Sequence, residues 1–146
     1  MKLTSPVFQN NEKIPPKYTC DGEDISPPLE IAEVPAETKS LVLISDDPDA
    51  PGGSWIHWLV WNIDPAITEI AENTVPTGAV EGITSFGKTG YGGPCPPSGT
   101  HRYFFKLYAL DTRIDLTAEA DKEKLEQAIE GHILDQVKLI GLYDRQ

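Results

Sequence analysis

The side chains best suited to chemistry gather in two segments, each of which joins a loop rich in proline and glycine to an aromatic, strand-like run. The first segment carries Asp47 and His57, and the second carries His101 and Tyr103. A carboxylate, two imidazoles, a phenol and free N–H groups of the loops can surround a tetrahedral oxyanion. We therefore expect the two segments to form the walls of one site.

Each polar group has an expected role at this site. His57 is the candidate for the main charge-carrying group, because free imidazole titrates in the same range as the second ionisation of phosphate, so binding should peak at roughly pH 6 to 6.5. Asp47 would accept from a protonated ligand oxygen or orient a histidine, whereas Asp49 should form a turn and Arg102 should pair with an acidic neighbour. A simpler interpretation, with His57 as a core histidine and both aspartates as turn formers, stays open.

Two strand-like runs must position the first of these segments. Residues 39–44 form a short apolar run that leads into the charged loop 45–53. Residues 55–63 are apolar on both faces except at His57 and Asn62, so we expect a central strand there. Because side chains alternate along a strand, one face should carry Trp55, His57, Leu59 and Trp61.

A third strand and one helix complete the pattern. Residues 101–110 are rich in aromatic residues, and the odd-numbered side chains, from His101 onward, should share one face. A single helix, capped by Thr117 or Asp121, is expected to follow. Residues 133–143 should then form a last strand, in which Gly141 suggests a β-bulge.

The chain length fits a single domain spanning residues 1–146, and the net charge limits the classes of partner that the protein can bind. The formal net charge of -11 repels nucleic acids and anionic lipid surfaces, and no run of lysine or arginine offers a local basic patch. The sequence shows neither the apolar stretch of a signal peptide nor one long enough to span a bilayer. We expect a cytoplasmic protein that binds no nucleic acid and does not associate stably with membranes.

The two cysteines, Cys20 and Cys95, are too few for a disulfide framework. In a reducing compartment we expect free thiols. A single bridge stays open as the alternative, because both cysteines lie in turn-like segments that could border the same site. An oxidising or hyperthermophilic cell would permit that bridge.

The two segments resemble the signature of the phosphatidylethanolamine-binding protein family. The motifs are Asp-Pro-Asp-Ala-Pro at 47–51, Trp-x-His at 55–57 and Pro-Pro-x-Gly-Thr-His-Arg-Tyr at 96–103. Weaker similarity runs from about 5 to 143 and is closest to the short bacterial and archaeal branch. The resemblance implies a mostly β fold, with two packed antiparallel sheets, Greek-key features and one helix in the C-terminal half.

The resemblance also implies which residues bind a ligand. Asp47, His57 and Tyr103 match positions that touch a bound phosphate or acetate in the family. Cys95 stands where some members have glycine, so its side chain must point away from the ligand or narrow the site. The positions that match the frame of the pocket are Pro48, Asp49, Pro51, Trp55, Pro96, Pro97 and His101.

We therefore expect a non-catalytic protein that binds a small phosphate- or carboxylate-bearing ligand, needs no cofactor and could form a homodimer. The alternative is a regulator that inhibits a kinase or protease by recognising an anionic group on its partner. A hydrolase built from Ser98, His101 and Asp47 is less favoured, because Ser98 lacks a Gly-x-Ser-x-Gly elbow. A metal site is also less favoured, because no short-spaced ligand pair is present; its ligands would be Asp47, Asp49, His57 and His101.

Overall fold

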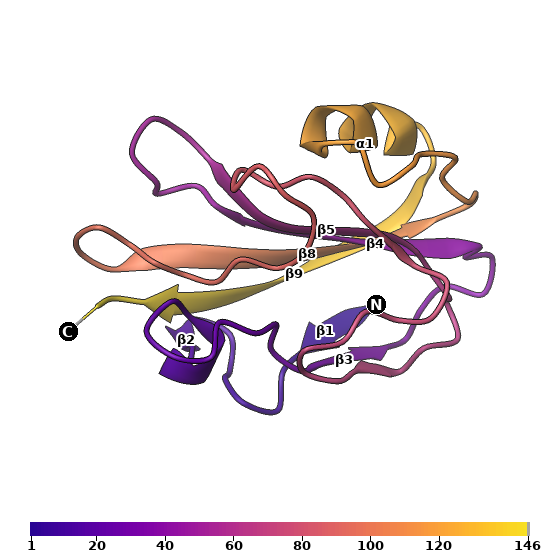
Figure 1. Cartoon of the computed structure of the whole chain (residues 1–146). Coiled ribbons are helices and arrows are strands. Elements are labelled where there is room, and N and C mark those ends of the chain that lie inside the picture. Colours follow the sequence, from indigo (N-terminus) through magenta and orange to yellow (C-terminus); the bar gives the residue numbers. More distant parts are fainter. Residues whose placement is uncertain (146) are drawn as a thin grey trace.

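The computed structural model describes residues 1–145, which form two β-sheets and one α-helix (Figure 1). The larger sheet has the strand order β2-β9-β8-β4-β5-β7, and the smaller has the order β1-β3-β6. The elements are β1 (Lys2–Thr4), β2 (Glu12–Lys13), a 3-10 helix (Pro16–Tyr18), β3 (Leu29–Ala32), β4 (Ser40–Asp47), β5 (Trp55–Ile63), β6 (Glu69–Ile70), β7 (Val80–Glu81), β8 (His101–Leu110), α1 (Lys122–Ile129) and β9 (Ile133–Tyr143).

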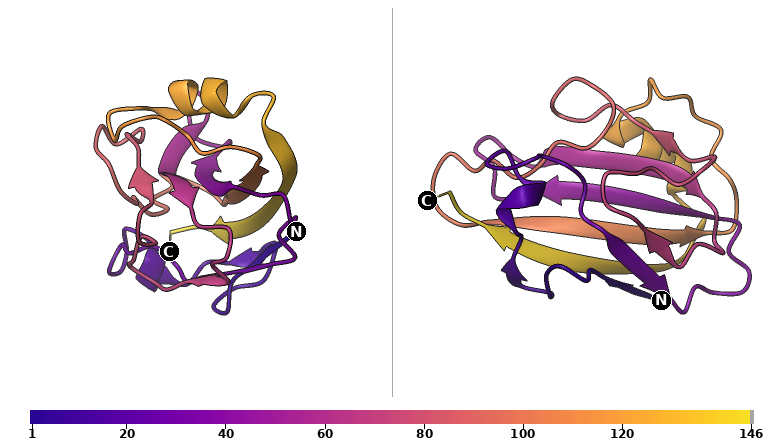
Figure 2. Two further views of the ribbon diagram at one scale, coloured as in Figure 1. Left: turned by 90° about the vertical axis from the view of Figure 1, so that its right-hand side faces the viewer. Right: turned by 60° about the horizontal axis from the view of Figure 1, so that its bottom comes forward.

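The strand connections have the Greek-key character that the resemblance implied. In the large sheet β4, β5 and β7 lie side by side in the order in which they follow along the chain, while β6 belongs to the small sheet. Strand β8 then returns to the free side of β4. All strand pairs are antiparallel except the short pair β2 and β9. Figure 2 shows the long strands β4, β5, β8 and β9 side by side. The prediction of a mostly β, two-sheet fold is confirmed.

Each face of the six-stranded sheet covers its own apolar cluster. The three-stranded sheet lies against one face and helix α1 against the other (Figure 1). Leu43, Trp58 and Phe105 belong to the cluster between the sheets, whereas Ile44 and Trp61 belong to the cluster beneath the helix. The central strands are therefore buried on both sides, which accounts for their nearly continuous apolar sequence.

Strand β4 is longer than the sequence pattern indicated. It continues to Asp47, and every residue in it is buried. Strands β5 and β8 flank it on both sides, so that Asp47 pairs with Trp55 and Asp46 pairs with Phe104. The two aspartates therefore lie in a central strand and not in the loop where the sequence placed them. They point to opposite faces of the sheet, as neighbouring strand residues do.

A β-bulge at His57 changes the predicted face assignment of β5. Ser45 pairs with Trp58 and Asp46 pairs with Ile56, so His57 is the extra residue between them. The prediction that Trp55, His57, Leu59 and Trp61 share one face was wrong for this reason. Leu59 and Trp61 pack beneath α1, whereas Trp55 and His57 line a pocket on the other face. Bulges commonly re-aim a side chain beside a binding site.

The C-terminal part confirms one local prediction and corrects another. Asp121, and not Thr117, caps α1, and its carboxylate accepts from the backbone N–H of Lys124 at 3.1 Å. Gly141 is not a bulge, because it pairs in register with Tyr103. A side chain at Gly141 would collide with Ile14, so the glycine allows a close approach. Within residues 1–145, no helix is long and apolar enough to span a bilayer.

Candidate functional site

A pocket of about 310 Å³ lies at one end of the sandwich, where β4 ends and β5 and β8 begin. The loops that form this end of the molecule are at the left of Figure 1. Both predicted segments therefore contribute to one cavity, with an additional residue from the connection after β7. The lining residues are Asp47, Ala50, Pro51, Trp55, His57, Phe86, Cys95, Pro96, Pro97, His101 and Tyr103.

Most residues expected at the site line this pocket, but Pro48 and Asp49 do not. The sequence reasoning missed Ala50, which lies within the matched motif, and Phe86, which lies far from it. The ring of Phe86 makes edge contacts with His57 at 5.4 Å and with Trp55 at 5.5 Å between centroids. A single aromatic residue in a segment rich in glycine and threonine was the only available signal.

Asp49 turns away from the pocket to hold the loop onto β8. Its Oδ2 accepts from the backbone N–H and the Nε of Arg102, both at 2.9 Å, and its Oδ1 accepts from Nη2 at 2.8 Å. The ion pair predicted for Arg102 is therefore present. The hydrogen bonds from Arg102 lower the pKa of Asp49 from 3.8 to about 2. The turn itself is closed by Asp47, whose Oδ1 accepts from the N–H of Asp49 at 2.8 Å.

The other oxygen of Asp47 orients His101. The Nδ1 of His101 donates to Asp47 Oδ2 at 2.6 Å, and both side chains are buried. Each carboxylate oxygen of Asp47 thus already accepts one hydrogen bond from the protein. In its protonated form His101 can also donate from Nε2, which makes no hydrogen bond within the described chain. Asp47 therefore contributes mainly by orienting the imidazole.

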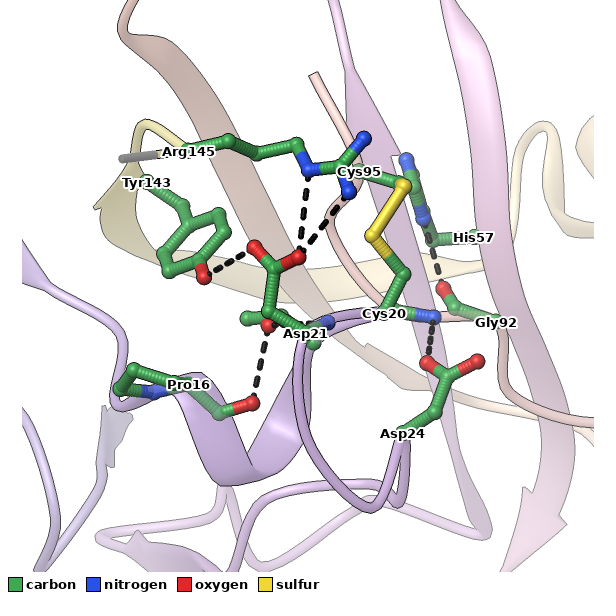
Figure 3. Close-up of a disulfide and its surroundings, with 11 residues drawn as sticks. Pro16, Cys20, Asp21, Asp24, His57, Gly92, Cys95, Tyr143 and Arg145 are labelled. Carbon is green, nitrogen blue, oxygen red and sulfur yellow. Dashed lines mark hydrogen bonds and ion pairs between the residues drawn. A yellow bond between two sulfur atoms is a disulfide. The ribbon is translucent and has the colours of Figure 1, made fainter. Parts of the chain in front are cut away.

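His57 has a different environment from the one that the sequence suggested. Its Nδ1 donates to the carbonyl oxygen of Gly92 at 2.6 Å (Figure 3), and its ring meets the edge of Tyr103. Burial lowers the pKa of His57, although the Gly92 carbonyl and the Asp47 carboxylate oppose this effect. The ring is therefore neutral at neutral pH, with Nε2 as an acceptor. This geometry argues against His57 as the main cationic group.

Tyr103 supplies a hydroxyl whose bonding capacity is unused. The residue is 1% exposed, and its hydroxyl forms no hydrogen bond of good geometry among residues 1–145, although the Asp47 carboxylate and the Cys95 backbone lie close to it. Burial, followed by the nearby Asp47 carboxylate, raises the pKa of Tyr103, so the group stays a neutral O–H donor. Buried polar groups are rarely left unpaired, because each costs about 1 to 3 kcal/mol. An unpaired donor inside a pocket indicates a place for a ligand atom.

A disulfide joins the pocket loop to the N-terminal part of the chain. Cys20 and Cys95 are bonded to each other, so the expectation of free thiols was wrong and the open alternative was right (Figure 3). The backbone N–H of Cys20 also donates to Pro94 O at 3.1 Å. The Cys95 side chain points toward Cys20 and still forms part of the pocket wall. The two turns meet only in the folded chain.

The geometry does not assemble either of the less favoured chemical sites. Ser98 is exposed, and no hydrogen bond joins it to His101 in the part of the chain that the structure describes. Asp49 is bound to Arg102 and the Nδ1 of His57 to a carbonyl, so neither is placed to complete a metal site. Across residues 1–145, no group of three or more His, Cys, Asp or Glu residues could hold a metal ion.

Comparison with known proteins identifies the family. The family model described as phosphatidylethanolamine-binding protein matches residues 4–144. A protein of Methanothermobacter thermautotrophicus, described as a UPF0098 protein, is 54% identical over 150 residues, which cover 99% of each chain. A UPF0098 protein of Aquifex aeolicus is 48% identical over 152 residues, covering 99% of this chain and 89% of its own.

Solved structures agree with this assignment. A Chlamydia trachomatis protein, described as a homologue of phosphatidylethanolamine-binding protein, superposes with a TM-score of 0.95 at 44% identity, covering 99% of this chain and 97% of its own. The E. coli protein YbcL, described as a member of the mammalian family, superposes with a TM-score of 0.93 at 31% identity, covering 99% and 98%. On its sequence, its fold and its pocket motifs, the chain belongs to the phosphatidylethanolamine-binding protein family.

Proposed function

We propose that the pocket binds a small ligand bearing a phosphate or carboxylate group and does not transform it. The observation that carries this proposal is the buried, unpartnered hydroxyl of Tyr103 on the pocket wall. An oxyanion placed beside it would accept from this hydroxyl and from a protonated His101. The ligand would thereby satisfy the donor that the protein leaves unpaired.

The mixture of donors and acceptors favours a protonated phosphate over a carboxylate. The Nε2 of His57 is an acceptor, because Nδ1 carries the proton given to Gly92. A phosphate group near neutral pH is partly protonated, since its second pKa is about 6, and its P–OH can donate to this nitrogen. A carboxylate has no proton to offer at that pH. Phosphate and phosphomonoesters are therefore the preferred ligands.

The electrostatics predict weak and selective binding. No lysine or arginine lines the pocket, and the formal net charge of the chain is -11. Affinity must then come from hydrogen bonds formed inside a partly apolar cavity, without long-range attraction. The same negative charge supports the proposal that nucleic acids and anionic membranes are not partners.

The lining also supports a role without catalysis. It includes no serine, threonine or lysine, and its one cysteine is bonded in a disulfide. These are the side chains that most often act as nucleophiles. The pairing of Asp47 with His101 resembles the base and orienting group of a hydrolase, yet the nearest serine in sequence, Ser98, is not joined to it. Binding is the simpler use of the arrangement.

A regulatory role is the second candidate function. Trp55 and Phe86 are 40% and 41% exposed, and both line the pocket. Large aromatic residues exposed beside a polar cavity are typical of surfaces that contact another protein. A partner protein could therefore insert a phosphorylated or carboxylate side chain between them. In this second proposal the pocket still binds the anionic group, and the exposed rings of Trp55 and Phe86 contact the partner protein around it.

The test is an NMR titration of the ¹⁵N-labelled protein with inorganic phosphate. We expect saturable shifts confined to the pocket loops and to the start of β8. Tyr103→Phe removes only the unpaired hydroxyl and should weaken binding about tenfold, since one hydrogen bond to an anion contributes about 1.4 kcal/mol. Tyr108→Phe is the matched control, because Tyr108 lies on the same strand and packs beneath α1.

Two outcomes would contradict the proposal. One is the absence of any saturable shift at roughly tens of millimolar phosphate, the weak end of useful affinity. The other is turnover of an ester, peptide or phosphoester substrate that disappears in His101→Ala, which would make the pocket an active site. Acetate in place of phosphate should bind more weakly, because it cannot donate to His57.

A further inference from the structure

We propose that the Cys20–Cys95 disulfide is a thiol-exchange site whose reduction weakens phosphate binding. The proposal rests on the proposed function of the pocket and adds a means of regulating it. Cys95 is exposed and forms part of the pocket wall, and Cys20 is partly exposed. A thiolate from solution can therefore approach the Cys95 sulfur without prior unfolding of the chain.

The disulfide is the covalent cross-link that fastens the segment 95–100, which forms few hydrogen bonds to the rest of the described chain. Residues 96–100 make no hydrogen bond within the described chain, and the polar neighbour of the Cys95 backbone is the Tyr103 hydroxyl. The preceding Pro94 is held by the N–H of Cys20, and ladder pairing resumes at His101, which lies opposite Tyr143. Between these two points, the covalent link through Cys95 and the packing of the buried Pro96 hold the chain in place.

The other end of the link is firmly anchored. Asp21, next to Cys20, accepts from the Tyr143 hydroxyl at 2.6 Å and from Arg145 at 3.2 Å (Figure 3). The Thr19 hydroxyl donates to Pro16 O at 2.8 Å. These hydrogen bonds hold the turn around Cys20 in place. The disulfide therefore restrains the pocket loop at Cys95.

The tethered segment carries an essential part of the pocket wall. Pro96 and Pro97 line the cavity together with Cys95, and the Cys95 backbone lies near the Tyr103 hydroxyl. Release of the tether would let this wall move away and expose the cavity to water. The neighbouring Gly92 and Gly93 keep their hydrogen bonds to His57 and Asp24, so the remainder of the site should persist.

The exchange is a balanced two-electron reduction by an external thiol. A thiolate attacks the Cys95 sulfur, a new S–S bond forms there, and the bond to Cys20 breaks. Cys20 leaves as a thiolate and takes up a proton. A second thiolate then attacks the external sulfur of the mixed disulfide, which releases the Cys95 thiolate and an oxidised disulfide of the reagent. The protein gains two electrons and two protons.

Dithiothreitol and inorganic phosphate are sufficient to test the inference. The phosphate dissociation constant is measured by NMR for the oxidised protein, for the protein reduced under native conditions, and for Cys20→Ser/Cys95→Ser. We expect reduction to raise the dissociation constant at least about fivefold, equivalent to about 1 kcal/mol. The double variant should match the reduced protein and should not respond to dithiothreitol.

Equal phosphate affinity of the oxidised and reduced proteins would overturn the inference. So would a disulfide that resists dithiothreitol until the protein is unfolded. If the oxidised protein binds no phosphate, the proposed function and the effect of reduction on affinity both fail. The heteronuclear NOE of Ser98, Gly99 and Thr100 then decides whether the disulfide tethers the loop. Lower NOE values after reduction would support a released loop, and unchanged values would contradict it.

Discussion

Adjacent aspartates on β4 give the two faces of the large sheet different chemistry. On the pocket face, Asp47 accepts from the Nδ1 of His101 at 2.6 Å. On the helix face, Asp46 accepts from the Nζ of Lys106 at 2.9 Å. Both carboxylates are buried, and both basic partners come from β8. The arrangement is similar, but Lys106 lies outside the pocket that His101 lines, and the second ring nitrogen of His101 makes no hydrogen bond within the described chain.

The Asp47–His101 and Asp46–Lys106 pairs also differ in the space around them. Asp46 Oδ1 and the Tyr103 hydroxyl are both buried and lack a hydrogen-bond partner among the described residues. Only the Tyr103 hydroxyl lies on the wall of a pocket that a ligand can enter, whereas Asp46 lies beside the apolar cluster beneath α1. An unsatisfied group therefore indicates binding only where the packing leaves room for a partner.

The largest effect should come from removing core packing on the helix face. Leu125 is fully buried, and Leu125→Ala should lower the free energy of unfolding by about 2 to 4 kcal/mol through lost transfer energy and a residual cavity. Urea denaturation measures this loss. Phosphate affinity should stay at the wild-type value, because α1 does not contribute to the pocket. A change in affinity would mean that the two faces are coupled.

Asn substitutions of the two aspartates compare the faces directly. Asp46→Asn leaves Lys106 without its ionic partner and should lower the free energy of unfolding by about 1 to 3 kcal/mol without affecting phosphate binding. Asp47→Asn removes the carboxylate that orients the His101 ring, so phosphate should bind more weakly by up to about tenfold. Calorimetric titration with phosphate measures the affinity of both variants and shows which aspartate affects binding. Tighter binding in Asp47→Asn would show that repulsion between the carboxylate and the anion dominates.

A smaller effect should appear in the pH dependence of stability. Burial lowers the pKa of His57 below its ordinary value of 6.5, so the unfolded chain takes up this proton at a higher pH than the folded chain. The associated stability is complete above about pH 6.5 and is lost as the pH falls through the folded-state pKa. Wild type should therefore lose more stability than His57→Gln between about pH 7 and about pH 5. Equal slopes in denaturation experiments would argue against a buried neutral imidazole.

The smallest effect should follow from breaking the exposed ion pair of Asp49. Arg102→Gln should change the free energy of unfolding by no more than about 1 kcal/mol, because the Arg102 side chain is 52% exposed and water screens the pair. The same variant should raise the pKa of Asp49 from about 2 toward 3.8, which carboxyl NMR can follow. A large loss of stability would mean that the loop fastened by Asp49 is part of the folding core.

The sequence by itself determined the elements and most of the pocket residues. The apolar run of β5, the aromatic alternation of β8 and the Asp121 cap are local signals, since they depend on neighbours along the chain. The family motifs placed His101 and Tyr103 beside Asp47, and the structure brings these residues into one cavity. Their roles in binding stay predictions.

Tertiary structure decided the features that depend on residues distant in the chain. The bulge that turns His57 into the pocket arises from its register against β4. Burial keeps that ring neutral, and the Gly92 carbonyl, 35 positions away, decides which nitrogen carries the proton. The Cys20–Cys95 disulfide joins residues 75 positions apart. The spacing of apolar residues along a chain predicts its helices and strands, but it does not predict which of their surfaces meet. Folding determines those contacts, and with them the protonation and the covalent links of the site.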